Sequence, residues 1–346
     1  MTAQKFMLGV FKHLPQFIVR RMAGAPLEID GNVLDANIQL VANQAANAET
    51  PTELAAMRAG IHESFKLLNG PRRKNVTVRD SQFDGPAGPL AMRVYEPVGA
   101  ATPRPAILFF HQGGLVVMDV DTDDTFCTVL ADVCQAIVIS LDYRLCPENA
   151  FPAAFDDALA LWAHVQAQGA DMGIDRERVA LAGDSAGALL SSVLCQIIRD
   201  RGDEIRPAAQ LLGYPWVTTQ LAETGSVASC AEAFPLTRNT MEFFNAMVFP
   251  DGKNIDHPYA NPLAHENLAD LPPAIIATAG FDPIRDQGND YAARLKAAGN
   301  KVKHYCFSSL CHSFWSMGNV SRACDRACDQ LARDLAAFLQ KADEAH

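Results

Sequence analysis

The chain has 346 residues, with 29 lysines and arginines against 40 aspartates and glutamates, so its formal net charge is −11. Hydrophobic residues make up 49% of the chain and charged residues 20%, which provides a large core and excludes disordered and collagen-like proteins. An acidic chain also repels phosphate backbones, so we expect no nucleic-acid partner. The composition predicts a folded, acidic, soluble protein.

The first 70 residues predict an arm made of helices. Apolar residues recur at helical spacing over Phe6–Ile18 with basic residues between them, and Pro15 is a candidate kink. We expect this amphipathic helix to pack on the rest of the protein, with contact to a membrane surface as the alternative. The helical pattern resumes over Ala36–Ala48 and Thr52–Asn69, and Gly70-Pro71 ends it.

The beginning of the chain shares some features with a signal peptide. Lys5 precedes an apolar stretch, and Ala23-Gly24-Ala25 resembles a cleavage site. Basic residues and Pro15 interrupt that stretch, so we expect the segment to remain in the mature protein. No uncharged apolar run approaches the ~20 residues needed to span a bilayer. We therefore expect no integral membrane segment.

Beyond Gly70, short apolar runs rich in β-branched residues predict eight strands. They are Val76–Asp84, Leu90–Tyr95, Ala106–Phe110, Ala136–Leu141, Val179–Ala182, Gln210–Leu212, Ile275–Ala279 and Val302–Phe307. The five residues from Gly85 to Pro89 suit a tight antiparallel connection between the first two strands. From the third strand onward, helical patterns intervene at Asp124–Cys134, Ala153–Gln168, Ala186–Arg201, Arg285–Ala298 and Ser321–Gln340. This alternation predicts an α/β fold with a mainly parallel sheet and helices on both faces.

One stretch, Tyr214–Leu263, breaks the alternation of strands and helices and is a candidate lid. Its large apolar side chains are Trp216, Phe234, Phe243, Phe244, Met247 and Phe249. Two interpretations remain open: these side chains form a small core within the insertion, or some of them line a substrate cavity.

The pentapeptide Gly183-Asp184-Ser185-Ala186-Gly187 lies between a predicted strand and a predicted helix. A G-x-S-x-G at such a turn needs glycine at its outer positions, because the turn leaves no room for a Cβ. It also raises the serine hydroxyl above the carboxyl edge of the sheet, at a helix N-terminus. Ser185 is therefore the candidate nucleophile.

A serine nucleophile needs a base, and the base needs a carboxylate to orient it. Asp282 follows the strand Ile275–Ala279, and His312 follows the strand Val302–Phe307, so both lie beyond strand carboxyl ends, where parallel sheets build their sites. The order Ser, Asp, His is that of α/β-hydrolases. Asp286, one helical turn after Asp282, is the competing carboxylate.

Acyl transfer also needs donors for the oxygen that becomes negatively charged. His111-Gln112-Gly113-Gly114 follows the strand Ala106–Phe110, and adjacent glycines let backbone N–H groups approach a ligand closely. The N–H of Ala186, directly after the nucleophile, can supply a third donor. We therefore expect Gly113, Gly114 and Ala186 to form an oxyanion hole.

With these residues the chain resembles the bacterial hormone-sensitive-lipase-like branch of the α/β-hydrolases, also called family IV carboxylesterases. The resemblance covers roughly residues 70–340. Besides the Gly183–Gly187 turn, it rests on Asp142–Glu148 running into Phe151–Ala154, on Tyr259–Leu263, on Asp282–Asp286 and on His312–Phe314.

The resemblance implies how the chain is divided. Residues 71–213 and 264–346 would form the catalytic core, and the arm 1–70 and the insertion 214–263 would form a cap over the active site. It also implies homodimers built through the final strand and helix. Three residues depart from the family pattern: Gln112 replaces a glycine of the usual His-Gly-Gly-Gly, Ser313 stands where glycine is usual, and Cys146 stands where alanine is common.

These residues predict a serine carboxylesterase that forms an acyl-enzyme on Ser185, with His312 as base and Asp282 orienting it. A small, capped cavity favours small-molecule esters with short to medium acyl chains, and the mechanism needs no metal and no organic cofactor. The residues expected near the substrate are Gln112, Asp184, Tyr214 and Trp216. Amidase or lactonase activity on the same triad stays an alternative, because the triad does not distinguish acyl leaving groups. A non-catalytic receptor for small ligands is the second alternative.

Nine cysteines are scattered along the chain without a C-x-x-C pair. Their odd number and their positions predict free thiols in a reducing compartment rather than a disulfide framework. Cys324 and Cys328 share a helical face, but no histidine or carboxylate pattern completes a set of metal ligands. We therefore expect a cytoplasmic protein without a metal site.

Overall fold

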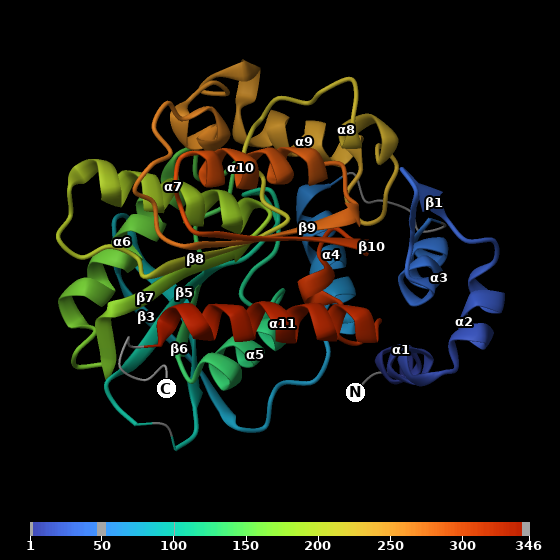
Figure 1. Ribbon diagram of the computed structural model, residues 1–346, viewed down its shortest axis with the longest axis horizontal. Helices are drawn as coiled ribbons and strands as arrows, with labels where there is room; N and C mark the ends of the chain where they lie inside the picture. The colour runs from blue at the N-terminus through green and yellow to red at the C-terminus, as the bar shows by residue number, and fades with distance from the viewer. Residues whose placement is uncertain (1–2, 47–52, 100, 341–346) are drawn as a thin grey trace.

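A central eight-stranded sheet organises the computed structural model, which describes residues 3–46, 53–99 and 101–340 (Figure 1). The strands are β3 (Val76–Gly85), β4 (Gly88–Pro97), β5 (Arg104–Phe110), β6 (Ile137–Leu141), β7 (Ile174–Asp184), β8 (Ala209–Gly213), β9 (Ala274–Phe281) and β10 (Val302–Cys311). Their order across the sheet is β10-β9-β8-β7-β5-β6-β4-β3. All eight predicted strands are therefore confirmed.

Strand direction also follows the prediction. The β3–β4 hairpin and the β4–β6 pair are antiparallel, and the other neighbours are parallel. Every residue of β5, β6, β8 and β9 is buried, which explains why these strands read as continuous apolar runs in the sequence. The carboxyl ends of the parallel strands meet at one edge of the sheet.

Helices cover both faces of the sheet, as Figure 1 shows. The helices of the core are α5 (Asp124–Cys134), α6 (Ala153–Gln168), α7 (Ala186–Arg201), α10 (Arg285–Ala297) and α11 (Arg322–Leu339). Helices α5 and α11 pack together on one face, and α6, α7 and α10 lie on the other. Each face buries its own large apolar cluster, so the sheet is held between two hydrophobic layers.

The N-terminal arm contains more elements than the sequence predicted. Its helices and strands are α1 (Ala3–His13), α2 (Gln16–Ala23), β1 (Glu28–Ile29), β2 (Asn32–Val33), α3 (Ala36–Ala45) and α4 (Leu54–Leu68). The expected single helix is two, because Pro15 interrupts it and stands at the N-cap of α2. The hairpin of β1 and β2 was not predicted, since strands of two residues carry no alternating pattern. The predicted ends at Ala48 and Thr52 lie outside the described residues.

One face of α2 packs against the protein and the other does not. Val19 and Ala23 are buried, whereas the Phe17 side chain is 75% exposed. Arg20 and Arg21 are also exposed. Within the described residues, no helix is both long enough and apolar enough to cross a membrane.

The insertion after β8 contains short helices. They are α8 (Ser226–Ser229), α9 (Arg238–Val248) and the 3-10 turns η1 (Pro250–Gly252), η2 (Pro258–Ala260) and η3 (Pro262–Ala264). Its aromatic residues divide between the two roles considered for them. Phe249 is buried against the ring of Trp216, whereas Phe234, Phe243 and Phe244 line a cavity.

Candidate active site

Ser185 occupies the turn between β7 and α7 in a backbone conformation that is rare for residues with a side chain (φ 51°, ψ −114°). The Ser185 N–H donates to the Gly213 carbonyl at 2.8 Å, and the Leu189 N–H donates to the Ser185 carbonyl at 3.1 Å. A Cβ on Gly187 would overlap the carbonyl of Phe110, which explains the glycine there. The turn therefore presents the serine at the start of α7.

His312 and Asp282 meet beyond the ends of β10 and β9. The Nδ1 atom of His312 lies 2.8 Å from Oδ2 of Asp282, and the other Asp282 oxygen accepts the Ile284 N–H at 2.9 Å. Asp282 is fully buried and the exposed fraction of His312 is 4%. Because the Nδ1 proton is held by the carboxylate, Nε2 is the ring atom left for a reacting group.

Asp286 takes a different position. Its Oδ2 atom accepts the backbone N–H of Ser226 at 2.7 Å, and its Oδ1 atom accepts from Arg285 at 3.1 Å. It therefore joins α10 to α8 of the insertion. Asp282, and not Asp286, is the carboxylate hydrogen-bonded to His312.

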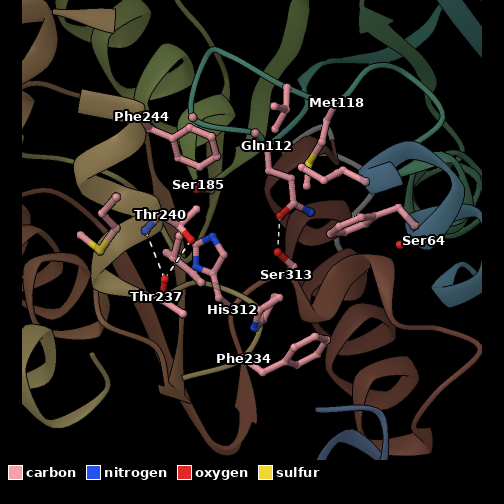
Figure 2. Close-up of a pocket in the computed structure, with 18 of the residues that line it drawn as sticks. Ser64, Gln112, Met118, Ser185, Phe234, Thr237, Thr240, Phe244, His312 and Ser313 are labelled. Carbon is pink, nitrogen blue, oxygen red and sulfur yellow. Dashed lines mark hydrogen bonds between the residues drawn. The ribbon is translucent and has the colours of Figure 1, made fainter. Parts of the chain in front are cut away.

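Ser185 and His312 line the same cavity (Figure 2). Within the part of the chain that the structure describes, the Ser185 hydroxyl and the His312 ring form no direct hydrogen bond. Such contacts are often long before substrate binds and tighten in the substrate complex. The fold thus places the Ser185 hydroxyl and the His312 ring at one cavity without a hydrogen bond between them.

The loop Gln112–Gly114, which we call the oxyanion loop after the role predicted for it, follows β5 at the same edge. Gly113 has a φ of 121° and Gly114 a φ of 61°, and the Gly113 carbonyl accepts from Val116 and Val117, each at 3.0 Å. A Cβ on Gly113 would overlap the Val117 carbonyl. In the described residues, no backbone carbonyl accepts from the N–H of Gly113 or Gly114. These two donors are available to a ligand.

His111 and Tyr143 hold the start of this loop. The Tyr143 hydroxyl donates to the His111 carbonyl at 2.8 Å, and the two rings stack with centroids 4.2 Å apart. Nδ1 of His111 donates to the Gln112 carbonyl at 2.6 Å. Burial lowers the pKa of His111 to about 4, so its ring is neutral at physiological pH.

The cavity has a volume of about 970 Å³ and is lined mainly by apolar side chains. The arm contributes one wall, including Leu8, Val41 and Phe65. The insertion also contributes lining residues, including Trp216, Phe234 and Phe244. The volume lies within the range of small-molecule sites.

A trio of potential ligand groups lies apart from the Ser185, His312 and Asp282 set. Atoms of His62, Asp119 and Asp121 all lie within 4.8 Å of one another. His62 Nδ1 lies 2.7 Å from Asp119, and Arg93 pairs with Asp121 at 2.5 Å. These contacts already give the three side chains partners within the protein.

Comparison with known proteins decides the family. Residues 107–316 match the model of the family described as the alpha/beta hydrolase fold. Carboxylic ester hydrolase LipN of Mycobacterium tuberculosis is 36% identical over 331 residues, covering 92% of this chain and 87% of LipN. Esterase LipI of the same organism is 40% identical over 266 residues, covering 75% of this chain and 82% of LipI. A crystal structure of a Pyrobaculum calidifontis esterase superimposes with a TM-score of 0.81 at 31% identity, covering 88% of this chain and 99% of that one.

The chain is an α/β-hydrolase of the hormone-sensitive-lipase-like carboxylesterases.

The two departures from the family pattern in the active-site loops contact each other. The hydroxyl of Ser313 donates to Oε1 of Gln112, a bond that Figure 2 shows. Ser313 has a φ of 65°, a conformation that explains why the carboxylesterases usually have glycine there. Gln112 and Ser313 therefore tie the oxyanion loop to the histidine loop, which we define as residues 312–316. The third departure, Cys146, is a buried free thiol.

The four residues expected near the substrate divide into two pairs. Gln112 and Trp216 line the cavity. Asp184 and Tyr214 do not: both are fully buried, and the Tyr214 hydroxyl donates to Asp184 Oδ2 at 2.6 Å. This differs from the expectation, because neighbouring residues at the end of a strand point to opposite sides. Ser185 faces the cavity and Asp184 lies behind it.

Some residues around the site were missed by sequence reasoning. Asp123 and Ser316 are buried and bonded to each other at 2.5 Å, and Ser316 also accepts from Nε2 of Gln112 at 2.9 Å. Asp123 belongs to a run with three other acidic residues, Asp119 to Asp124, which is typical of a solvated turn. Ser316 carries no sequence signal of its own.

Proposed function

We propose that Ser185, His312 and Asp282 are the catalytic triad of this carboxylesterase. The observation that carries the proposal is the 2.8 Å contact between His312 and the buried Asp282, at the cavity that Ser185 also faces. A carboxylate in this position fixes the imidazole ring and stabilises the cation that forms on it. The Nε2 atom, which carries no proton in this tautomer, can then act as the base for Ser185.

The reaction proceeds in two halves. His312 removes the proton of Ser185 as its oxygen attacks the ester carbonyl, and the same proton then passes to the leaving alcohol. The N–H groups of Gly113, Gly114 and Ala186 bind the oxygen that becomes negative in the tetrahedral intermediate. Water, activated by His312, attacks the acyl-enzyme and releases the acid. None of these steps needs a metal or an organic cofactor.

The cavity supports esters of short to medium acyl chains as substrates. It is mainly apolar, is bounded on two sides by helices, and its volume of about 970 Å³ suits a small molecule. Amidase or lactonase activity uses the same groups, so matched ester, amide and lactone substrates must be compared. The receptor alternative is disfavoured because the base and its carboxylate are both present.

We also propose that residues 1–70 and 214–263 form a cap over a core of residues 71–213 and 264–346. The walls that both segments give to the cavity support this division. A homodimer through β10 and α11 is part of the proposal, since β10 lies at one edge of the eight-stranded sheet. All nine cysteines are free thiols, which supports a cytoplasmic location.

The test is hydrolysis of p-nitrophenyl butyrate by purified protein, with and without an organophosphonate inhibitor. We expect the inhibitor to add covalently to the peptide that contains Ser185, detected by mass spectrometry, and Ser185→Ala to abolish both labelling and turnover. Ser64→Ala is the matched control, because Ser64 lines the same cavity and bonds only within α4. Full activity of Ser185→Ala, or labelling at another residue, overturns the proposal.

A further inference from the structure

A chain of hydrogen bonds begins in the histidine loop and runs behind the active site. The Ser313 hydroxyl donates to Gln112 Oε1, and Gln112 Nε2 donates to Ser316 Oγ at 2.9 Å. Ser316 donates in turn to Oδ1 of Asp123 at 2.5 Å. Nε2 of Gln112 also lies 3.5 Å from the same Asp123 oxygen. Each residue in this chain donates to the next, and the chain ends at the buried carboxylate of Asp123.

A second chain reaches the same carboxylate from the nucleophile turn. The Tyr214 hydroxyl donates to Asp184 Oδ2 at 2.6 Å, and the carboxyl groups of Asp184 and Asp123 lie within hydrogen-bonding reach of each other. The exposed fraction is 0% for Asp184 and 1% for Asp123. Their remaining oxygens, Asp123 Oδ2 and Asp184 Oδ1, are buried, and within the described residues neither has a hydrogen-bond partner. One proton between the two groups gives both oxygens a partner.

We propose that Asp123 and Asp184 share one proton and act as positioning residues for the reaction. Asp184 directly precedes the nucleophile Ser185, and Asp123 holds Gln112, which directly precedes Gly113. Through Ser316 and Ser313 the pair also reaches the loop that carries His312. The shared proton thus joins the nucleophile turn, the oxyanion loop and the histidine loop into one hydrogen-bonded unit. This role rests on the proposed catalytic site, but the shared proton itself does not.

The charges around the pair agree with this arrangement. Burial and the neighbouring Asp123 charge raise the pKa of Asp184 well above its usual value. Burial also raises the pKa of Asp123, and hydrogen bonds from Ser316 and Gln112 oppose that rise. Because burial raises the pKa of both carboxyl groups and the charge of one raises the pKa of the other, a single proton held between them is favoured over two charges. The two groups together carry one negative charge rather than two.

The other titratable groups that the pair influences are Cys127 on α5, Tyr143 after β6, Tyr214 after β8 and Cys328 on α11. Burial and the charge of the pair raise the pKa of each of these groups well above its usual value. All four are therefore neutral at physiological pH, and their protonation does not change across the working range. Any change of the pair with pH comes from its own proton.

The hydrogen bond between positions 123 and 184 needs one donor and one acceptor, but it does not need two carboxyl groups. In Asp123→Asn, an amide N–H can donate to Asp184, and the amide oxygen can still accept from Ser316. Asp184→Asn can in the same way donate to Asp123 and accept from Tyr214. Asp123→Ala removes the acceptor for Ser316 and leaves Asp184 without its partner. Asparagine at either position should therefore keep the hydrogen bond between the two side chains, whereas alanine removes it.

Infrared difference spectroscopy tests the shared proton without reference to activity. At about pH 8, we expect the wild-type protein to show the carbonyl band of a protonated carboxylic acid, shifted in D₂O, and Asp184→Asn to lack it, because the remaining Asp123 carboxyl has a pKa of about 6. Asp142→Asn is the control, because the pKa of Asp142 is also raised by burial, to about 6, so this carboxyl is ionised at that pH. The band should persist in Asp142→Asn. If wild type and Asp184→Asn give the same spectrum, the shared proton does not exist.

Kinetics with a p-nitrophenyl ester test the positioning role. We expect Asp123→Ala to lower kcat by about 10²-fold with little change in KM, because small displacements of reacting groups cost that much. Asp123→Asn and Asp184→Asn should each retain most of the wild-type kcat. Asp132→Asn, on the same helix α5, should have the kcat of the wild type. If Asp123 had a merely structural role, folded Asp123→Ala would have the same kcat as the wild type. The proposal is also overturned if Asp123→Asn lowers kcat as much as Asp123→Ala does. If Ser185→Ala remained active, the catalytic site would fail while the infrared result still stood.

Discussion

The hydroxyl of Tyr143 donates a 2.8 Å hydrogen bond to the carbonyl of His111, while its ring stacks on the His111 imidazole. Tyr143 follows β6 and His111 follows β5, so this contact fixes the beginning of the oxyanion loop against the neighbouring strand. The loop donors of Gly113 and Gly114 depend on that fixed beginning. The contact therefore connects the packing of the sheet to the chemistry at its edge.

Tyr143→Phe tests this connection by removing one hydroxyl and keeping the ring. We expect kcat to fall about tenfold or more, because misplaced oxyanion donors lose part of a contribution of about 10²–10³. Stability should fall by about 1 kcal/mol, the usual net value of a hydrogen bond. Ester kinetics and urea denaturation measure the two effects. Tyr291→Phe, also buried and bonded to Gln196, is the control that should lose stability but not kcat.

The identity of the triad carboxylate gives a second prediction. Asp282→Asn should lower kcat by roughly 10³–10⁴-fold, because an amide cannot stabilise the imidazolium and favours the wrong tautomer. Asp286→Asn should keep nearly all activity, since Asp286 bonds the backbone of Ser226 rather than His312. The two variants are compared by kcat/KM on one ester. The assignment is wrong if Asp286→Asn is the more damaging change.

The buried His111 predicts how stability depends on pH. Burial lowers its pKa to about 4 in the folded chain, whereas an unfolded histidine titrates near about 6.5. The unfolded state therefore binds a proton first as the pH falls, and the stability contributed by the neutral ring is lost between about pH 6.5 and 4.

We expect the free energy of unfolding to include a loss of order 2 kcal/mol between pH 7 and pH 5 that comes from His111. Urea denaturation of the wild type and of His111→Gln at both pH values isolates the contribution of His111, because the variant has no imidazole ring to titrate. The raised pKa values of Asp123 and Asp184 act in the opposite direction, but they are common to both proteins. Parallel pH dependences in the two proteins would contradict the prediction.

The bond between Gln112 and Ser313 predicts that substitutions at these positions are not independent. Gln112→Ala and Ser313→Ala should each lower kcat, and the double variant should lose less than the two losses together. We expect a coupling energy of about 1 kcal/mol, within the range for residues in direct contact. A double-mutant cycle on kcat/KM measures it. Strict additivity would show that the two departures from the family pattern are unrelated.

Much of the fold could be predicted because it depends on local sequence. The buried parallel strands are continuous apolar runs, and the helices between them carry their own periodic patterns, so type and order follow from the chain itself. The hairpin of β1 and β2 could not be predicted, since it rests on two residue pairs. The break at Pro15 was anticipated only as a kink, because a proline does not say whether the helix resumes in the same direction.

Sequence patterns identify the candidate nucleophile, base and orienting carboxylate, because each carries a spacing signal at the end of a strand. The sequence favours Asp282 over Asp286 as the carboxylate, and the fold brings the Asp282 carboxylate into a hydrogen bond with His312. The sequence also predicts Asp184 near the substrate, whereas the fold buries that side chain against the Tyr214 hydroxyl. Such decisions depend on side-chain direction and on contacts between residues far apart in the chain. Neither is set by local patterns, so both wait for the packing of the whole protein.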